Sequence, residues 1–244
     1  MREISEVLQV TKNFSPTLIL HLAAHTDLEY CERAQEDAWL TNALGTENVA
    51  LAARGLGATL VYISTAGIFG GEKEYYTDFD TPNPLSYYAK SKYHGEQFVE
   101  RFVPNYFVFR AGWMMGGGIK KDKKFINKLY SQIKSGAKEL YVVDDKLGTP
   151  TYTNDFSGSL LRVVDSGYYG LYNQVCKGSA SRYEVACKFV ELLGLADDVT
   201  IQKVDSDHFK QEYFAPRPAS EKLLNTKLTH RGINFMRDWE VCLE

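Results

Sequence analysis

A tyrosine and a lysine four residues apart are the residues of this chain best suited to catalysis. Tyr88 and Lys92 lie in the run YYAKSKYHGE, which ends at Glu96. On a helix this spacing places both side chains on one face, one turn apart. A phenol ordinarily titrates near pH 10, and a neighbouring ammonium favours the phenolate and lowers that pKa. The pair therefore predicts a proton donor that works near neutral pH.

A hydroxyl residue ends the apolar segment that precedes this helix. The run TLVYIST ends at Thr65, and ligands of parallel α/β sheets bind at the carboxyl ends of the strands. Thr65 can therefore hold the substrate oxygen that receives the proton from Tyr88. The chain has 16 tyrosines, and a second pair with the same spacing, Tyr130 and Lys134, has no such hydroxyl to serve it. We interpret the second pair as a solvent-exposed helix face.

Helical and strand patterns alternate along the chain and predict how these residues are positioned. The first strands are expected at 17–23, 58–64 and 105–111, and the helices at 3–13, about 32–55 and 86–102. Continuous apolar strands that alternate with helices are typical of a parallel sheet covered on both faces. After residue 113 the pattern loosens into shorter elements, with helices near 122–135, 154–165 and 181–193 and strands at 139–143 and 170–175.

Six motifs occur together in an order that resembles one known family. They are HLAAHT at 21–26, NALGT at 42–46, STAGIFGG at 64–71, YYAKSKYHGE at 87–96, RAGW at 110–113 and GTPT at 148–151. With this set the chain resembles the extended short-chain dehydrogenases/reductases, and among them the dTDP-4-dehydrorhamnose reductase group. The resemblance implies an α/β fold with a Rossmann-like doubly wound parallel sheet. It places a partial NAD(P)-binding domain at 1–112 and mainly a smaller substrate-binding lobe, interleaved with the sheet, at 113–244.

The resemblance also implies a reaction. NADPH or NADH would reduce a nucleotide-linked 4-keto-6-deoxysugar, in nucleotide-sugar or cell-surface polysaccharide biosynthesis. Tyr88 would protonate the oxygen, Lys92 would lower the pKa of Tyr88 and hold the nicotinamide ribose, and Thr65 would donate a hydrogen bond to the same oxygen. Tyr88 and Lys92 thus also belong to the cofactor site. Leu22, Ala23 and Ala24 complete that site, because small residues at a strand end let a flat cofactor lie close to the backbone.

Four residues are expected on the substrate side: Thr65, Ala66, Trp113 and Arg217. Trp113 offers a stacking surface for a sugar ring or base. Arg217, between two prolines, presents a guanidinium suited to a phosphate. The run GGGIKKDKK at 116–124 is either a second diphosphate contact or an ordinary solvated loop.

No glycine-rich turn precedes the first expected strand. Families of this kind begin with a strand, a G-x-x-G-x-x-G turn and a helix that binds the cofactor pyrophosphate. By comparison with the family, we expect about forty to fifty upstream residues to be absent and the sheet to be N-terminally incomplete. The strand at Thr17 to Leu22 would then have an unpaired edge. We expect the 244-residue chain alone to self-associate into a homo-oligomer and to bind NAD(P)H very weakly.

Proteins with three other functions share this fold: dehydratases, 4-epimerases and non-catalytic subunits. Sugar-nucleotide dehydratases carry an Asp-Glu pair after the strand-end threonine, where this chain has Ala66-Gly67, so that reading is discounted. The reductase group usually has an acidic and an aromatic residue at these two positions. A 4-epimerase would use the same Thr65, Tyr88 and Lys92. A non-catalytic subunit, like the regulatory subunit of methionine adenosyltransferase, also has this fold. The intact set of Thr65, Tyr88 and Lys92 argues against this alternative, and the missing glycine loop favours it.

Composition excludes several classes of partner. With 44% hydrophobic and 24% charged residues and a net charge of -3, the chain fits a globular enzyme and gives no electrostatic reason to expect nucleic acid or a membrane. His21 and His25 lack an evident third ligand, so no metal site is expected. The four cysteines form no C-x-x-C motif and suit the reduced thiols of a cytoplasmic protein: Cys31, Cys176, Cys187 and Cys242.

Overall fold

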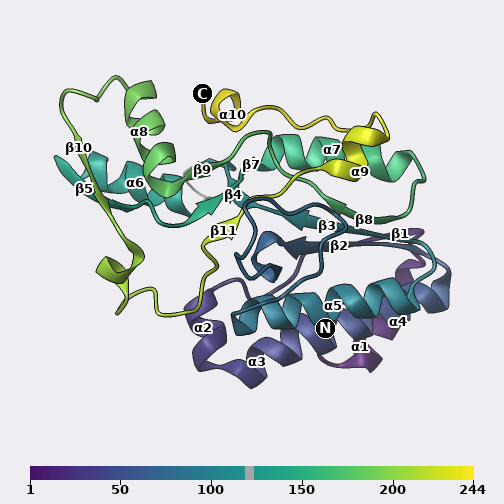
Figure 1. The fold of residues 1–244 in the computed structure, drawn as a ribbon. Coiled ribbons are helices and arrows are strands. Elements are labelled where there is room, and N and C mark those ends of the chain that lie inside the picture. The colour runs from purple at the N-terminus through teal and green to yellow at the C-terminus, as the bar shows by residue number, and fades with distance from the viewer. Residues whose placement is uncertain (119–123) are drawn as a thin grey trace.

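A central parallel sheet organises the computed structural model, which describes residues 1–118 and 124–244 (Figure 1). Its strands lie in the order β1 (Leu18–His21), β2 (Thr59–Thr65), β3 (Tyr106–Ala111) and β8 (Gly170–Asn173). All neighbouring strands pair in parallel. The expected α/β fold with a Rossmann-like parallel sheet is confirmed.

Helices cover both faces of this sheet, as its continuous apolar strands require. On one face lie α4 (Gly45–Leu56) and α5 (Tyr87–Phe102), whose Ala53 and Val99 pack with Leu60 and Val108 of the strands. On the other face lie α7 (Thr153–Asp165) and the short α9 (Thr226–His230) and α10 (Trp239–Leu243). The alternating inward and outward side chains of β2 and β3 thus serve two separate cores.

A second lobe is built around a small parallel pair, β5 (Glu139–Val143) and β10 (Thr200–Val204). Helices α6 (Phe125–Lys134) and α8 (Arg182–Leu192) pack on it. Two further small sheets lie nearer the main sheet. One orders β11 (Ser220–Glu221), β6 (Leu147–Gly148) and β9 (Ala180–Ser181), and the other pairs β4 (Trp113–Met115) with β7 (Pro150–Tyr152). Since β8 and α7 return to the main sheet, we propose the division into 1–112 and an interleaved 113–244.

The long helix expected at about 32–55 is instead four consecutive pieces. They are α2 (Leu28–Arg33), α3 (Gln35–Trp39), a π-helical turn η1 (Leu40–Leu44) and α4. Ala34, with φ -117° and ψ 60°, separates the first two. The π-helical turn shifts the register of the side chains between α3 and α4, and such turns are frequent at functional sites. This one contains Asn42.

Strand β1 forms an end of the main sheet. Among the described residues no strand pairs with its outer edge, and Leu20 and Leu22 are 46% and 65% exposed. The amphipathic α1 (Ile4–Phe14) lies against α4 near this edge, and none of its residues is buried. The expected unpaired edge is therefore present in these residues.

Of the helices in the described ranges, none combines the length and apolar character needed to cross a bilayer. All four cysteines are free thiols.

Candidate active site

Helix α5 carries the predicted acid and is held tightly against the sheet. Its start is capped by Ser86, whose side chain accepts a hydrogen bond from the backbone N–H of Ala89. A Cβ on Gly95 would lie only 2.7 Å from the Tyr62 hydroxyl of β2 and 3.0 Å from the Thr46 side chain of α4. Glycine at this position therefore lets the three elements approach closely.

Thr65 and Tyr88 meet where the carboxyl end of β2 faces the start of α5. Tyr88 is partly buried, and the Thr65 side chain is near enough to its phenol to oppose the rise of the Tyr88 pKa. Thr65 also accepts a hydrogen bond from the backbone N–H of Gly67, at 3.2 Å. The structure thus brings together two of the three predicted catalytic residues through hydroxyl groups.

Lys92 lies one turn further along α5 and is only 4% exposed. Its Nζ atom lies 4.1 Å from the ring centroid of Tyr62, a cation–π contact. Among the described residues, no side chain or carbonyl makes a hydrogen bond with Nζ. Burial lowers the pKa of Lys92 to about 7, and the negative charge of Glu96 opposes this. An ammonium has three N–H donors, so Lys92 is suited to bind ligand hydroxyls.

The expected lowering of the Tyr88 pKa is not found. Burial raises the pKa of Tyr88 to about 12, the hydrogen bond from Thr65 opposes the rise, and the charge of Glu221 adds to it. Lys92 is not among the causes, because its ammonium faces the Tyr62 ring instead. Tyr88 is therefore fully protonated at neutral pH in this structure, which is the form that a general acid needs.

A buried polar network connects helix α5 to the loop after β1. The amide of Asn42 donates to the Ser91 hydroxyl of α5 (3.1 Å) and to the carbonyl of His25 (3.0 Å), and its oxygen accepts from the backbone N–H of His25 (2.8 Å). Asn42 thus has a structural role, because it links α5 to the loop after β1. His21 is 2.9 Å from the Thr46 hydroxyl, and burial lowers its pKa to about 3, so it is neutral.

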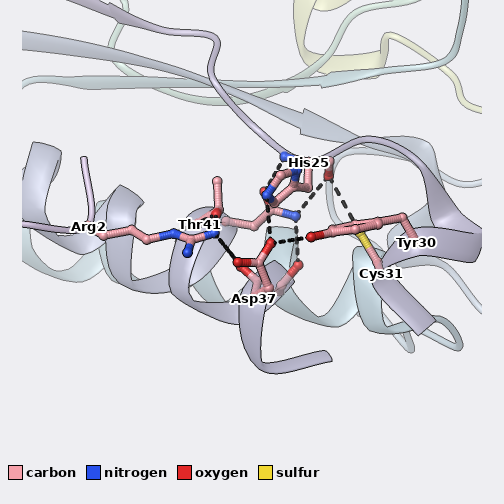
Figure 2. A network of polar contacts seen from close by, with 8 residues as sticks. Arg2, His25, Tyr30, Cys31, Asp37 and Thr41 are labelled. Carbon is pink, nitrogen blue, oxygen red and sulfur yellow. Dashed lines mark hydrogen bonds and ion pairs between the residues drawn. The ribbon is translucent and has the colours of Figure 1, made fainter. Parts of the chain in front are cut away.

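A second network fixes the loop after β1 (Figure 2). Asp37 lies between Arg2, His25 and Tyr30: it is 2.9 Å from His25 Nε2 and 2.7 Å from the Tyr30 hydroxyl, and it pairs with the Arg2 guanidinium. The hydrogen bond from Tyr30, followed by that from Arg2, lowers the pKa of Asp37. Because His25 closes the loop that begins at residue 22, the network holds this loop against α3.

The predicted cofactor residues Leu22, Ala23 and Ala24 lie in this loop, directly after β1. Leu22 and Ala23 are exposed and Ala24 is partly buried. Because β1 and β2 are parallel neighbours, the loop and Thr65 leave the sheet at the same edge. Small and accessible side chains at this edge are compatible with a cofactor that lies against the backbone.

Ala66 and Arg217 were expected to contact the substrate, but in this structure both contact other parts of the protein. Ala66 is 1% exposed in an apolar cluster with Phe69 and Tyr76, so its side chain cannot contact a substrate. Arg217 forms an ion pair of 2.7 Å with Glu29 of α2. A phosphate would therefore have to compete with this carboxylate for Arg217.

Trp113 lies between two protein groups. The guanidinium of Arg182 is 3.7 Å from its ring centroid, and a Cβ on Gly148 would lie 2.2 Å from its Cε2 atom. A ligand that stacks on this indole must therefore displace Arg182. The indole N–H donates to Glu221 at 2.6 Å. Neither Arg182 nor Glu221 was predicted, because no sequence spacing relates them to Thr65 or Trp113.

The remaining features of the described residues add no second site. Most of the lysine run at 116–124 lies outside the described residues. A hollow of about 470 Å³ is lined by residues such as Val175, Leu223 and His230 and includes none of the predicted site residues. Within 1–118 and 124–244, no three His, Cys, Asp or Glu side chains gather as a metal site would require.

The RmlD substrate-binding domain family matches residues 1–244. The chain belongs to this family.

Three proteins that are similar to this RmlD-family chain show which functions occur among its relatives. A dTDP-4-dehydrorhamnose reductase of Mycolicibacterium smegmatis is 32% identical over 231 residues, which are 93% of this chain and 68% of that protein. A dTDP-4-dehydrorhamnose reductase of Bacillus anthracis, solved in complex with NADP, has a TM-score of 0.92 and 33% identity, and the match covers 99% of this chain and 84% of that one. Methionine adenosyltransferase 2 subunit beta of Danio rerio is 29% identical over 191 residues, 76% of this chain and 58% of that protein.

Proposed function

We propose that the protein is an NADPH-dependent reductase of a dTDP-linked 4-keto-6-deoxysugar, like the dTDP-4-dehydrorhamnose reductases that it resembles. The observation that carries this proposal is the proximity of Thr65 and Tyr88 where β2 ends and α5 begins, with the buried Lys92 one turn further along α5. Two hydroxyl donors that meet at a strand end form a small site for a carbonyl oxygen on which negative charge develops.

The described residues fit the nicotinamide end of the cofactor. Lys92 is 4% exposed and its ammonium contacts the Tyr62 ring, so its N–H donors can serve the hydroxyls of a ribose. Leu22 and Ala23 leave the edge of the sheet open beside it. When bound, the reduced nicotinamide supplies the hydride that adds to the carbonyl carbon.

The protein's own part in the reaction is to position the carbonyl and to supply a proton. The Thr65 hydroxyl donates a hydrogen bond to the carbonyl oxygen, which orients it and stabilises its growing negative charge. Tyr88 donates its proton to that oxygen as the alkoxide forms. An alkoxide is a far stronger base than a phenolate, so transfer is downhill even with the pKa of Tyr88 at about 12. Asn42 and Ser91 keep α5, and so Tyr88, in place.

The test measures NADPH oxidation at 340 nm with dTDP-4-dehydrorhamnose and identifies the product. Net oxidation of NADPH with formation of dTDP-rhamnose supports the reductase. A 4-epimerase would instead interconvert two dTDP-sugars without net consumption of NADPH. A non-catalytic subunit would bind a partner protein and give no turnover; the relative from Danio rerio is named as a subunit of methionine adenosyltransferase 2. Either result would contradict the proposal.

A further inference from the structure

Glu221 is an acidic residue that the tertiary structure brings to the catalytic strand end. It lies on β11, which pairs with β6 so that Glu221 stands beside Gly148. Gly148 packs against the indole of Trp113, and the indole N–H donates to Glu221 Oε2 at 2.6 Å. One oxygen of the carboxylate is thus fixed by Trp113.

The second oxygen of Glu221 lies near the same space as the Thr65 hydroxyl. A Cβ on Gly67 would lie 3.3 Å from Glu221 Oε1 and 3.6 Å from Thr65 Oγ1, so both oxygens face the same small space. Because residue 67 has no side chain, this space beside the end of β2 stays open. Among the described residues, no donor makes a hydrogen bond to Oε1.

The surroundings of Glu221 combine burial with positive charge. Burial raises the pKa of Glu221, while the Trp113 N–H and the charges of Arg182 and Arg217 oppose this rise. The charge of Glu221 also contributes to the raised pKa of Tyr88, which places the two groups within electrostatic reach of each other. Glu221 is half-buried, and its Oε1 can accept a hydrogen bond from a donor that enters the space beside Gly67.

We propose that Glu221 is a specificity-determining residue whose Oε1 accepts a hydrogen bond from the sugar hydroxyl next to the carbonyl that is reduced. This inference rests on the proposed function, because Thr65 and Tyr88 fix where the carbonyl lies. In a 4-keto-6-deoxysugar that neighbour is the hydroxyl on C3. Glu221 thereby distinguishes the hydroxylated sugar from its 3-deoxy counterpart, as buried polar groups do when an analogue leaves them unpaired.

Binding of three ligands tests this role by calorimetry: dTDP, dTDP-rhamnose and the 3-deoxy form of dTDP-rhamnose. For the unmodified protein we expect dTDP-rhamnose to bind at least tenfold more tightly than either other ligand. Glu221→Ala and the nearly isosteric Glu221→Gln should each weaken dTDP-rhamnose about tenfold or more. Both variants should change the affinities for dTDP and the 3-deoxy compound less than twofold. Glu6→Gln, which removes an exposed charge on α1, is the matched control and should change none of them.

Two results would overturn the inference. If the Glu221 variants weaken all three ligands equally, the carboxylate only holds Trp113 in place. If the unmodified protein does not distinguish dTDP-rhamnose from its 3-deoxy form, no residue reads that hydroxyl. NADPH oxidation by the unmodified protein, measured in parallel, separates these failures from failure of the proposed function. Should Glu221→Ala fail to fold, Glu221→Gln carries the test alone, because it preserves the shape of the side chain.

Discussion

The chain contains two tyrosine–lysine pairs with identical helical spacing, and their surroundings differ completely. Tyr88 and Lys92 lie on α5, where the phenol meets Thr65 and the lysine is 4% exposed. Tyr130 and Lys134 lie on α6, where the tyrosine is partly buried and the lysine is exposed. Spacing alone therefore does not make a catalytic pair.

The difference comes from what lies beneath each helix. Helix α5 packs on β2, and Gly95 allows its close approach to Tyr62. Helix α6 packs through Leu129 on the apolar side of the lobe, against α8 and β5, and directs its polar face outward. A strand-end hydroxyl and burial set the proposed catalytic pair apart from the other, because both change the energy of protonating the groups.

Removal of the Tyr88 hydroxyl should have the largest effect. Tyr88→Phe is expected to lower kcat by about two to four orders of magnitude, because a positioned general acid is lost while the ring remains. Steady-state NADPH oxidation measures this, and circular dichroism checks the fold. Turnover close to that of the unmodified protein would show that another group supplies the proton.

Loss of the Lys92 ammonium should affect both rate and cofactor. Lys92→Ala is expected to lower kcat/KM and to weaken NADPH binding by about tenfold or more, because the buried donors are removed. Fluorescence titration with NADPH reports the second effect separately. Unchanged NADPH affinity would mean that Lys92 acts only through the packing of Tyr62.

The buried charge of Lys92 should also appear in the pH dependence of stability. Its pKa of about 7 in the folded protein lies below that of an unfolded lysine, so between about pH 7 and 10 the unfolded chain holds more protons. The charge therefore destabilises the fold below about pH 7, and this cost is relieved as the pH rises. Lys92→Met should be more stable than the unmodified protein at pH 7.

The stability gap between Lys92→Met and the unmodified protein should shrink by up to about 1.4 kcal/mol per pH unit above pH 7. Urea unfolding at pH 7 and pH 9 measures it, with Lys134→Met as the exposed control. A gap that does not depend on pH would show that Lys92 is not held in its charged form at a cost.

The smallest effects are expected on α6. Tyr130→Phe and Lys134→Ala should each leave activity within a factor of about two, because an exposed helix pair contributes only tenths of a kcal/mol. The same steady-state assay serves here. A hundredfold loss at either position would show that the catalytic pair lies on α6 and not on α5.

Local sequence signals placed most of the fold correctly. The apolar runs predicted β2 and β3 to within a residue or two, and α5 was predicted from its helical pattern and spacing. The short strands of the lobe, such as β6 and β11, were not predicted, because two-residue pairings leave no periodic pattern. The π-helical turn at Leu40–Leu44 was not predicted either, because a single π-helical turn between helices leaves no periodic pattern of its own.

For the site, the sequence by itself determined which residues have suitable functional groups and lie close together along the chain. Thr65, Tyr88 and Lys92 follow from a strand end and one helical turn, and both are local geometries. The tertiary structure alone decided their electrostatics: burial keeps Tyr88 protonated and turns the Lys92 ammonium toward Tyr62. It also decided that Glu221, from the far end of the chain, faces Thr65, since such contacts depend on how strands pair and not on spacing.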